Sequence, residues 1–250
     1  MNRSNWQKLG LIILVLVGAA FGLFEKNGGG GTQPSSSGPG PIQVTVDDKP
    51  ARTRTTPVSA RNDGPEFDFY VLALSWSPSY CATENSPDRE QCGRERHGFI
   101  VHGLWPQYES GFPEFCESRF SDRVSQQAAD SISDLMPGTG LVRYQWRKHG
   151  LCTGLDQRDY FATMRKAFGR IAIPDSFENP TRSQTLQPQS IETEFLKANP
   201  GMRANGVAVT CSNGHLADVR ICLTKDLKFR SCPEVDRDAC RSSRTQVPGI

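Results

Sequence analysis

The 250-residue chain has eight cysteines but no Cys-x-x-Cys pair. Zinc sites normally use such close pairs, so the spacing argues against a structural zinc protein. The larger part of the chain also lacks a strong net charge, because residues 1–64 hold seven basic and four acidic residues and leave 22 basic and 23 acidic residues to the remainder. A domain so close to neutral is not a polycation that coats nucleic acid through bulk counterion release. If it binds a polyanion, it does so with a local cluster of charges.

The sequence also lacks an apolar run of the about 20 residues that a membrane-spanning helix needs. The longest apolar run is "LGLIILVLVGAAFGLF" at residues 9–24, which carries no charge and exceeds the core of about 7–15 residues in a signal peptide. We predict that residues 1–26 are an export signal, either cleaved or retained as a membrane anchor. A buried helix is the alternative, but residues 27–64 are rich in Gly, Pro, Ser and Thr and are typical of a disordered linker.

All eight cysteines follow that linker. Their even number and the predicted export favour disulfides formed in an oxidising compartment. Reduced thiols of a cytosolic protein are the alternative. A domain of about 175 residues buries a sizeable core without cross-links, so we expect the disulfides to add stability to a core that already exists. The cysteines are Cys81, Cys92, Cys116, Cys152, Cys211, Cys222, Cys232 and Cys240.

Hydrophobic patterning predicts an α+β domain at residues 65–242, followed by a C-terminal tail at 243–250. Helical spacing of apolar residues predicts helices within 121–138, 156–171 and 190–201. Apolar runs predict strands within 66–81, 97–105 and 227–232, and a hairpin at 206–223 around Asn213-Gly214. Strands at both ends and helices in the middle favour a central, mainly antiparallel sheet packed against several helices.

Two of only four histidines lie beside tryptophans. In "YQWRKHGLC", residues 144–152, a helix would place Gln145, Lys148 and His149 on one face. The neighbouring cation would lower the pKa of the imidazole from about 6.5 and favour its proton-accepting form. The alternative is a solvated basic helix surface with an incidental histidine.

The second stretch is "FIVHGLWPQ", residues 99–107. On an extended strand His102 shares a face with Ile100, which would also suit a buried core histidine. Trp105 lies next to Pro106, where we expect the strand to end. An aromatic ring there can stack on a nucleobase, worth about 1–3 kcal/mol, although core packing is the commoner role of tryptophan. We expect His97 and His215 to be structural or surface residues.

Two imidazoles and a lysine meet the needs of one reaction without a metal. RNA carries its own nucleophile, the 2′-hydroxyl. Its cleavage needs a base for that proton, an acid for the departing 5′-oxygen, and positive charge for the phosphorane. Histidine suits both proton transfers because its pKa lies near working pH.

"FIVHGLWP" and "WRKHGLC" resemble the two signature segments of the ribonuclease T2 family, and "LALSWSPSYC" and "VRICLTKDLKFRSC" are also similar to that family. The resemblance covers about residues 66–240. It implies an α+β fold and a secreted or periplasmic endoribonuclease that leaves 2′,3′-cyclic phosphate ends on single-stranded RNA.

By position, the resemblance makes His102 the general acid, His149 the general base and Lys148 the group that stabilises the phosphorane. Trp105, Gln107 and Tyr144 would bind substrate. Gln145 matches a catalytic residue, commonly glutamate in the family, that assists at the transition state, and its neutral amide puts the rate in doubt more than the reaction. The resemblance also implies four disulfides: Cys81–Cys92, Cys116–Cys152, Cys211–Cys240 and Cys222–Cys232.

We therefore predict an exported, monomeric endoribonuclease with RNA as its partner, no cofactor, no metal and possible membrane attachment through residues 9–24. The neutral Gln145 supports an alternative, a catalytically weakened relative that binds RNA or acts as a toxin or signal.

Overall fold

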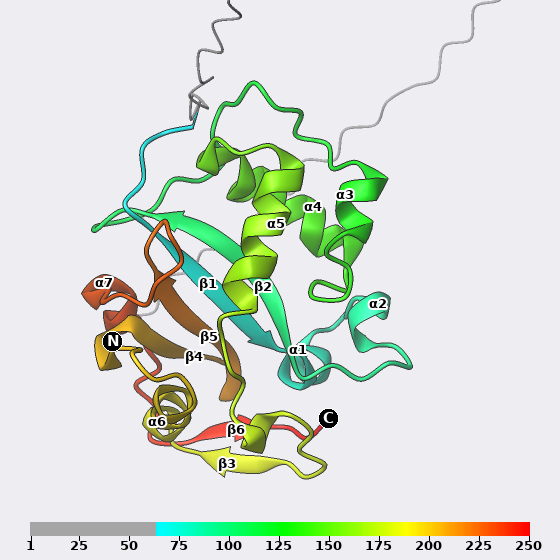
Figure 1. Cartoon of the computed structure of the whole chain (residues 1–250). Coiled ribbons are helices and arrows are strands. Elements are labelled where there is room, and N and C mark those ends of the chain that lie inside the picture. Colours follow the sequence, from blue (N-terminus) through cyan, green and yellow to red (C-terminus); the bar gives the residue numbers. More distant parts are fainter. Residues whose placement is uncertain (1–63) are drawn as a thin grey trace, which may run out of the picture. The chain divides into compact units, whose positions relative to one another are not determined.

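A computed structural model of the chain describes residues 64–250 (Figure 1). The predicted export signal at 1–26 and nearly all of the predicted linker at 27–64 lie outside the described residues. No helix within 64–250 is long and apolar enough to cross a membrane. The described part is α+β, as predicted.

One sheet of six strands organises the domain. Its order is β2-β1-β5-β6-β3, and β4 pairs with β5 as well. The pairing is antiparallel except for a single parallel bridge between β5 and β6, so the predicted mainly antiparallel sheet is confirmed. The strands are β1 (Phe69–Trp76), β2 (Phe99–Gln107), β3 (Gln184–Leu186), β4 (Val207–Ser212), β5 (His215–Leu223) and β6 (Thr245–Val247).

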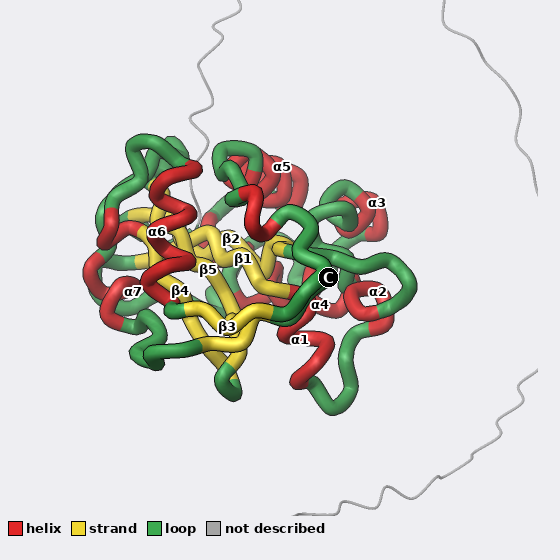
Figure 2. The backbone as a smooth tube through the Cα atoms, turned by 90° about the horizontal axis from the view of Figure 1, so that it is seen from below, coloured by secondary structure: helices red, strands yellow, loops and turns green. Residues whose placement is uncertain are grey.

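The helices gather in two groups at either side of the strands (Figures 1 and 2). In Figure 2, α6 and α7 lie at one side of the sheet and α2 and α3 at the other. The main core lies between the helices and one face of the sheet, where Leu72, Val101 and Phe161 are fully or almost fully buried. The helices are α1 (Ser77–Thr83), α2 (Arg89–Cys92), α3 (Gln126–Asp130), α4 (Thr139–Lys148), α5 (Gln157–Phe168), α6 (Pro188–Ala198) and α7 (Pro233–Arg237).

Local signals locate several of these elements. Asn213 and Gly214 have positive φ angles of 49° and 76°, and they form the predicted tight turn between β4 and β5. Asp156 caps α5, since its carboxylate accepts a hydrogen bond of 2.8 Å from the backbone N–H of Asp159. The helix predicted within 190–201 is α6, which ends at Ala198 before Pro200.

Two predicted elements are wrong in extent. The helix predicted over 121–138 is regular only in α3, and the chain continues as turns. The hydroxyls of Ser131 and Ser133 donate to the carbonyls of Ala128 and Asp130, and such side-chain bonds compete with helix continuation. The strand predicted within 227–232 is a single bridge between Leu223 and Phe229.

The predicted tail at 243–250 is also wrong, because this segment belongs to the fold. It contains β6, which pairs with β3. The indole Nε1–H of the buried Trp76 donates to the carbonyl of Pro248 at 3.0 Å, and the N–H of Ile250 donates to the carbonyl of Pro180 at 2.8 Å. Short strands with long-range partners leave little periodicity in the sequence.

All eight cysteines are paired. Cys116–Cys152 joins the loop after β2 to the short 3₁₀ helix Gly150–Thr153, which directly follows α4. The N–H of Phe115 also donates to the carbonyl of Lys148 at 2.9 Å, so this loop is tied to the end of α4. The other disulfides are Cys81–Cys92, Cys211–Cys240 and Cys222–Cys232, and all four pairs are those that the resemblance implies.

A bulge in β2 prepares the functional site. Ala73 of β1 pairs with Gly103 and Leu74 pairs with Val101, which leaves His102 without a partner on β1. Because of this extra residue, Val101 and Leu104 both pack into the main core although they are three positions apart. His102 and Trp105 therefore share the opposite face, which strict alternation would forbid. The strand also continues through Pro106 to Gln107, which the edge position of β2 permits.

Candidate active site

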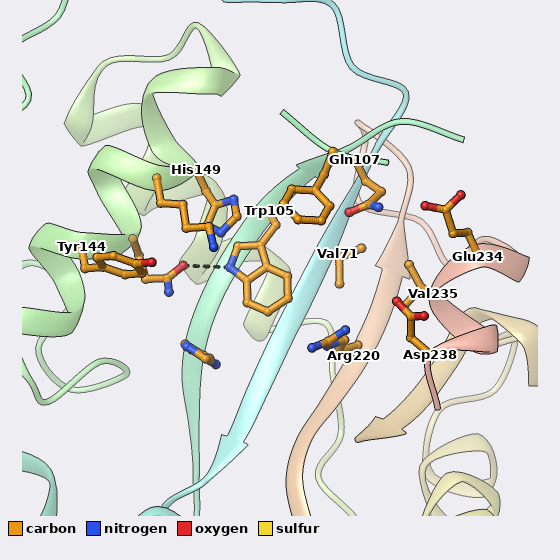
Figure 3. Close-up of a pocket in the computed structure, with 13 residues that line it drawn as sticks. Val71, Trp105, Gln107, Tyr144, His149, Arg220, Glu234, Val235 and Asp238 are labelled. Carbon is orange, nitrogen blue, oxygen red and sulfur yellow. Dashed lines mark hydrogen bonds between the residues drawn. The ribbon is translucent and has the colours of Figure 1, made fainter. Parts of the chain in front are cut away.

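A cavity of about 360 Å³ opens on the face of the sheet that carries His102 and Trp105, opposite the main core. Figure 3 shows β1, β2 and β5 forming its floor, with Tyr144 and His149 on one side and Glu234, Val235 and Asp238 on the other. The cavity brings together every residue that the sequence predicts for catalysis or substrate binding: His102, Trp105, Gln107, Tyr144, Gln145, Lys148 and His149.

His102 lies on the floor of the cavity, at the bulge in β2. Its Nδ1 is 3.1 Å from Oδ1 of Asp218 on β5, and its side chain is 34% exposed whereas that of Asp218 is 11% exposed. Burial raises the pKa of the Asp218 carboxyl, but the hydrogen bond from His102 and the charges of His102 and Arg220 outweigh it. The net pKa lies below the usual value, so Asp218 is ionised and accepts a hydrogen bond.

His149 lies at the end of α4 as its C-terminal cap, with its N–H bonded to the carbonyl of Gln145 at 2.9 Å. The residue is 3% exposed and its Nδ1 is buried without a hydrogen-bond partner. Burial lowers the pKa of the imidazole from 6.5 to about 3, assisted by the charges of Lys148 and His102. His149 is therefore neutral over a wide pH range and able to accept a proton.

Trp105 lies between the two histidines. Its ring is stacked on that of His149, with centroids 5.2 Å apart and an angle of 29°, and it meets His102 edge-on at 5.5 Å. Its Nε1–H donates to Oε1 of Gln145 at 2.8 Å, the bond that is dashed in Figure 3. The indole thus fixes the ring of His149 relative to the strand that carries His102.

Gln145 is 2% exposed, so its carbonyl oxygen lies in a nearly dry environment. The hydrogen bond from Trp105 satisfies that oxygen. A carboxylate could accept the same bond, so this contact needs an oxygen at the position and no particular charge.

Lys148 is held by a carboxylate at the rim of the cavity. Its Nζ lies 3.2 Å from Oε2 of Glu114, and it lies 5.9 Å from the ring centroid of Tyr144. The lysine side chain is 25% exposed and that of Glu114 is 46% exposed. A phosphate that binds Lys148 must compete with this solvent-screened pair, which is weak.

The two remaining residues that are predicted to bind substrate differ in solvent exposure. Tyr144 is 42% exposed and its ring contacts that of Phe115, so it is an accessible aromatic surface at the rim. Gln107 is 6% exposed and its amide nitrogen donates to the carbonyl of Gly111 at 3.0 Å. Its amide therefore also holds the turn after β2.

Several cavity residues lie outside the segments that predict the site. Arg220 of β5 places its guanidinium carbon 5.4 Å from the centroid of Trp105, and its Nε is buried without a partner. Glu234 and Asp238, at either end of α7, add an acidic side opposite His149 (Figure 3). The signal for β5 was polar Asp218 and Arg220 at alternate positions of an otherwise apolar strand.

The two other histidines lie outside this cavity. His97 lines a separate cavity near the Cys81–Cys92 disulfide. His215 begins β5, and its Nδ1 lies 2.9 Å from the carbonyl of Asn213. Within residues 64–250, no group of three or more His, Cys, Asp or Glu side chains could hold a metal ion.

Comparison with known proteins places this arrangement in a family. The model of the ribonuclease T2 family matches residues 67–232. A ribonuclease of Aeromonas hydrophila is 43% identical over 174 residues, which cover 68% of this chain and 77% of that protein. Ribonuclease DdI of Dictyostelium discoideum is 32% identical over 199 residues, covering 71% and 83%.

The fold agrees with this placement. The solved structure of RNase NT in complex with 5′-AMP superposes with a TM-score of 0.60 at 22% identity, covering 74% of this chain and 100% of that one. An RNase-related protein from Calystegia sepium superposes with a TM-score of 0.58 at 22% identity, covering 74% and 98%. The chain belongs to the ribonuclease T2 family and is an endoribonuclease of that type.

Proposed function

We propose that the protein cleaves single-stranded RNA by metal-independent transesterification and leaves 2′,3′-cyclic phosphate ends. His149 acts as the general base and takes the 2′-hydroxyl proton at Nε2. The 2′-oxygen attacks phosphorus, the ammonium of Lys148 stabilises the phosphorane, and His102 donates a proton to the departing 5′-oxygen. This cleavage step needs no second substrate, because both the attacking and the departing oxygen belong to the RNA.

One observation supports the proposal above all others. Imidazoles from two separate elements line one cavity and contact the same indole, one buried and neutral and the other bonded to a carboxylate. Acid–base catalysis by two groups needs their environments to differ in this way, so that one accepts a proton while the other donates.

Substrate binding follows from the same cavity. Lys148 would bind the scissile phosphate after its contact with Glu114 opens, and Trp105, Gln107 and the exposed ring of Tyr144 would contact bases. Because the attacking oxygen is the substrate's own 2′-hydroxyl, DNA should resist cleavage. We further propose that residues 1–26 direct export to the periplasm or the medium, with attachment through residues 9–24 if that segment is retained, and that the enzyme acts as a monomer.

Digestion of total RNA in the presence of EDTA tests the reaction. The wild-type protein should produce fragments with 2′,3′-cyclic phosphate ends, whereas His102→Ala and His149→Ala should lose nearly all activity. An oligonucleotide with 2′-O-methyl groups should bind without being cut. A His149→Ala protein with wild-type turnover would refute the assignment, and binding without cleavage by the wild type would favour the weakened RNA-binding alternative.

A further inference from the structure

We infer that Asp218 is a positioning residue for His102: its carboxylate accepts the Nδ1–H of the imidazole and so directs Nε2 into the cavity as the atom that protonates the leaving oxygen. The inference rests on the proposed function, because it concerns how the general acid is held. It adds a residue from β5, which neither signature segment contains.

Asp218 and His102 are in direct contact. Oδ1 of Asp218 lies 3.1 Å from Nδ1 of His102, and Asp218 is 7% exposed. A buried carboxylate is costly unless it is paired and hydrogen-bonded. Its partners are His102, the hydroxyl of Ser75 and the charge of Arg220, and of these only His102 carries out a proton transfer in the proposed reaction.

The strand order of the sheet permits this contact. β1 lies between β2, which carries His102, and β5, which carries Asp218. The two outer strands are about 10 Å apart, twice the usual strand spacing. The intervening residues of β1 are small: Ala73 pairs with Gly103 and Arg220, and Ser75 pairs with Asp218. The imidazole can therefore pass over β1 and reach the carboxylate.

The carboxylate of Asp218 also determines which nitrogen of His102 carries hydrogen. An ionised carboxylate only accepts hydrogen bonds, so Nδ1 of His102 must carry hydrogen in both the neutral and the charged ring. The exchangeable proton is then confined to Nε2. Without Asp218 the neutral ring could place its single hydrogen on either nitrogen, and the charged ring would lose its counter-charge.

Other charges face this pair and enter any pH profile. Arg220 lies two residues along β5 and lowers the pKa of Asp218. His149, at the end of α4, interacts electrostatically with His102, and Lys148 lies next to it. From β1 only the neutral hydroxyl of Ser75 faces the carboxylate. These groups remain in place when Asp218 alone is changed.

The test is Asp218→Asn with two substrates that differ only in the leaving group. The leaving group of a dinucleoside phosphate is an alkoxide, which needs a proton from the acid. The leaving group of a ribonucleoside 3′-(4-nitrophenyl phosphate) is a stable phenolate, which does not. We expect kcat for the dinucleoside phosphate to fall about 10- to 100-fold, with little change for the nitrophenyl ester, because general acid catalysis contributes about 100-fold or more.

The controls separate the possible failures. Asp134→Asn removes a carboxylate that pairs with Arg165 outside the cavity, and it should leave both substrates unaffected. An equal loss on both substrates, or no loss on either, overturns the role of Asp218 while leaving the proposed function intact. If His102→Ala also cleaves the dinucleoside phosphate normally, the proposed function fails instead.

A second measurement uses the wild-type protein alone, so its result does not depend on whether a variant folds. Imidazole ¹⁵N spectra at a pH where His102 is neutral should show hydrogen on Nδ1 and a bare Nε2. The opposite tautomer would overturn the inference, since the carboxylate would then face a nitrogen without a hydrogen.

Discussion

The burial of His149 predicts an unusual dependence of stability on pH. The residue is 3% exposed, and the pKa of its imidazole falls from 6.5 to about 3, first because of burial and then because of Lys148 and His102. In the unfolded chain the ring should titrate near the ordinary value. The folded protein therefore resists a proton that the unfolded chain accepts readily.

The sign and size follow from that difference. Between the two pKa values the unfolded chain binds more protons, so the stability contributed by a neutral His149 is complete above about pH 6.5 and falls as the pH drops toward about 3. At 1.36 kcal/mol for each pKa unit, the full effect approaches about 5 kcal/mol. Between about pH 7.5 and about pH 4.5 it amounts to about 3 kcal/mol.

Urea unfolding followed by tryptophan fluorescence, with the disulfides intact, measures this effect. Carboxylates also titrate in this range, so the informative quantity is the difference between wild type and His149→Asn at the two pH values. On lowering the pH, the free energy of unfolding of the wild type should drop by about 3 kcal/mol more than that of the variant.

His215→Asn is the matched control, because it removes an imidazole from the β4–β5 turn outside the cavity. It should follow the wild type at both pH values. If His149→Asn shows the same pH dependence as the wild type, the ring is not held neutral by burial, and the argument that it is the base loses its physical support.

Three further perturbations test other contacts. Gln145→Glu should give equal or higher kcat, since a carboxylate keeps the hydrogen-bonded oxygen and adds negative charge to the site; a large fall in kcat on a dinucleoside phosphate would contradict this. Glu114→Gln should lower KM about 2- to 5-fold at low salt by freeing Lys148, as expected for a weak exposed pair; an unchanged KM would show that the pair does not compete with phosphate. The double variant Cys116→Ala/Cys152→Ala opens a loop of 36 residues and should lose about 3–4 kcal/mol of unfolding free energy in urea, which a loss below about 1 kcal/mol would contradict.

Much of the fold follows from local patterns in the sequence. The apolar runs of β1 and β2, the turn at Asn213-Gly214 and the capped helix α5 each depend on neighbouring residues, and each lies where it is predicted. The extent of α3 and the position of β6 do not follow. Serine hydroxyls redirect the backbone after α3, and β6 depends on β3, a three-residue strand about sixty positions earlier in the chain.

The candidate site was predictable where chemistry and position coincide in one segment. His102, Lys148 and His149 lie in two short stretches, and the structure brings both stretches to one cavity. Alternate polar positions in β5 mark Asp218 and Arg220, but their place in the cavity was not predictable, because it depends on the register that pairs β5 with β1. A shift of one residue in that register would turn both side chains to the opposite face.

The bulge in β2 explains why the spacing of His102 and Trp105 works. Three positions on a regular strand would put the imidazole and the indole on opposite faces, and only one of them could then reach the cavity. With the extra residue they share a face, so Trp105 contacts both histidines while its Nε1–H is fixed by Gln145. That hydrogen bond needs only an acceptor oxygen, so an amide serves as well as a carboxylate. The amide of Gln145 therefore holds the indole that contacts both imidazoles, and we expect any effect of Gln145 on rate to come from its missing charge.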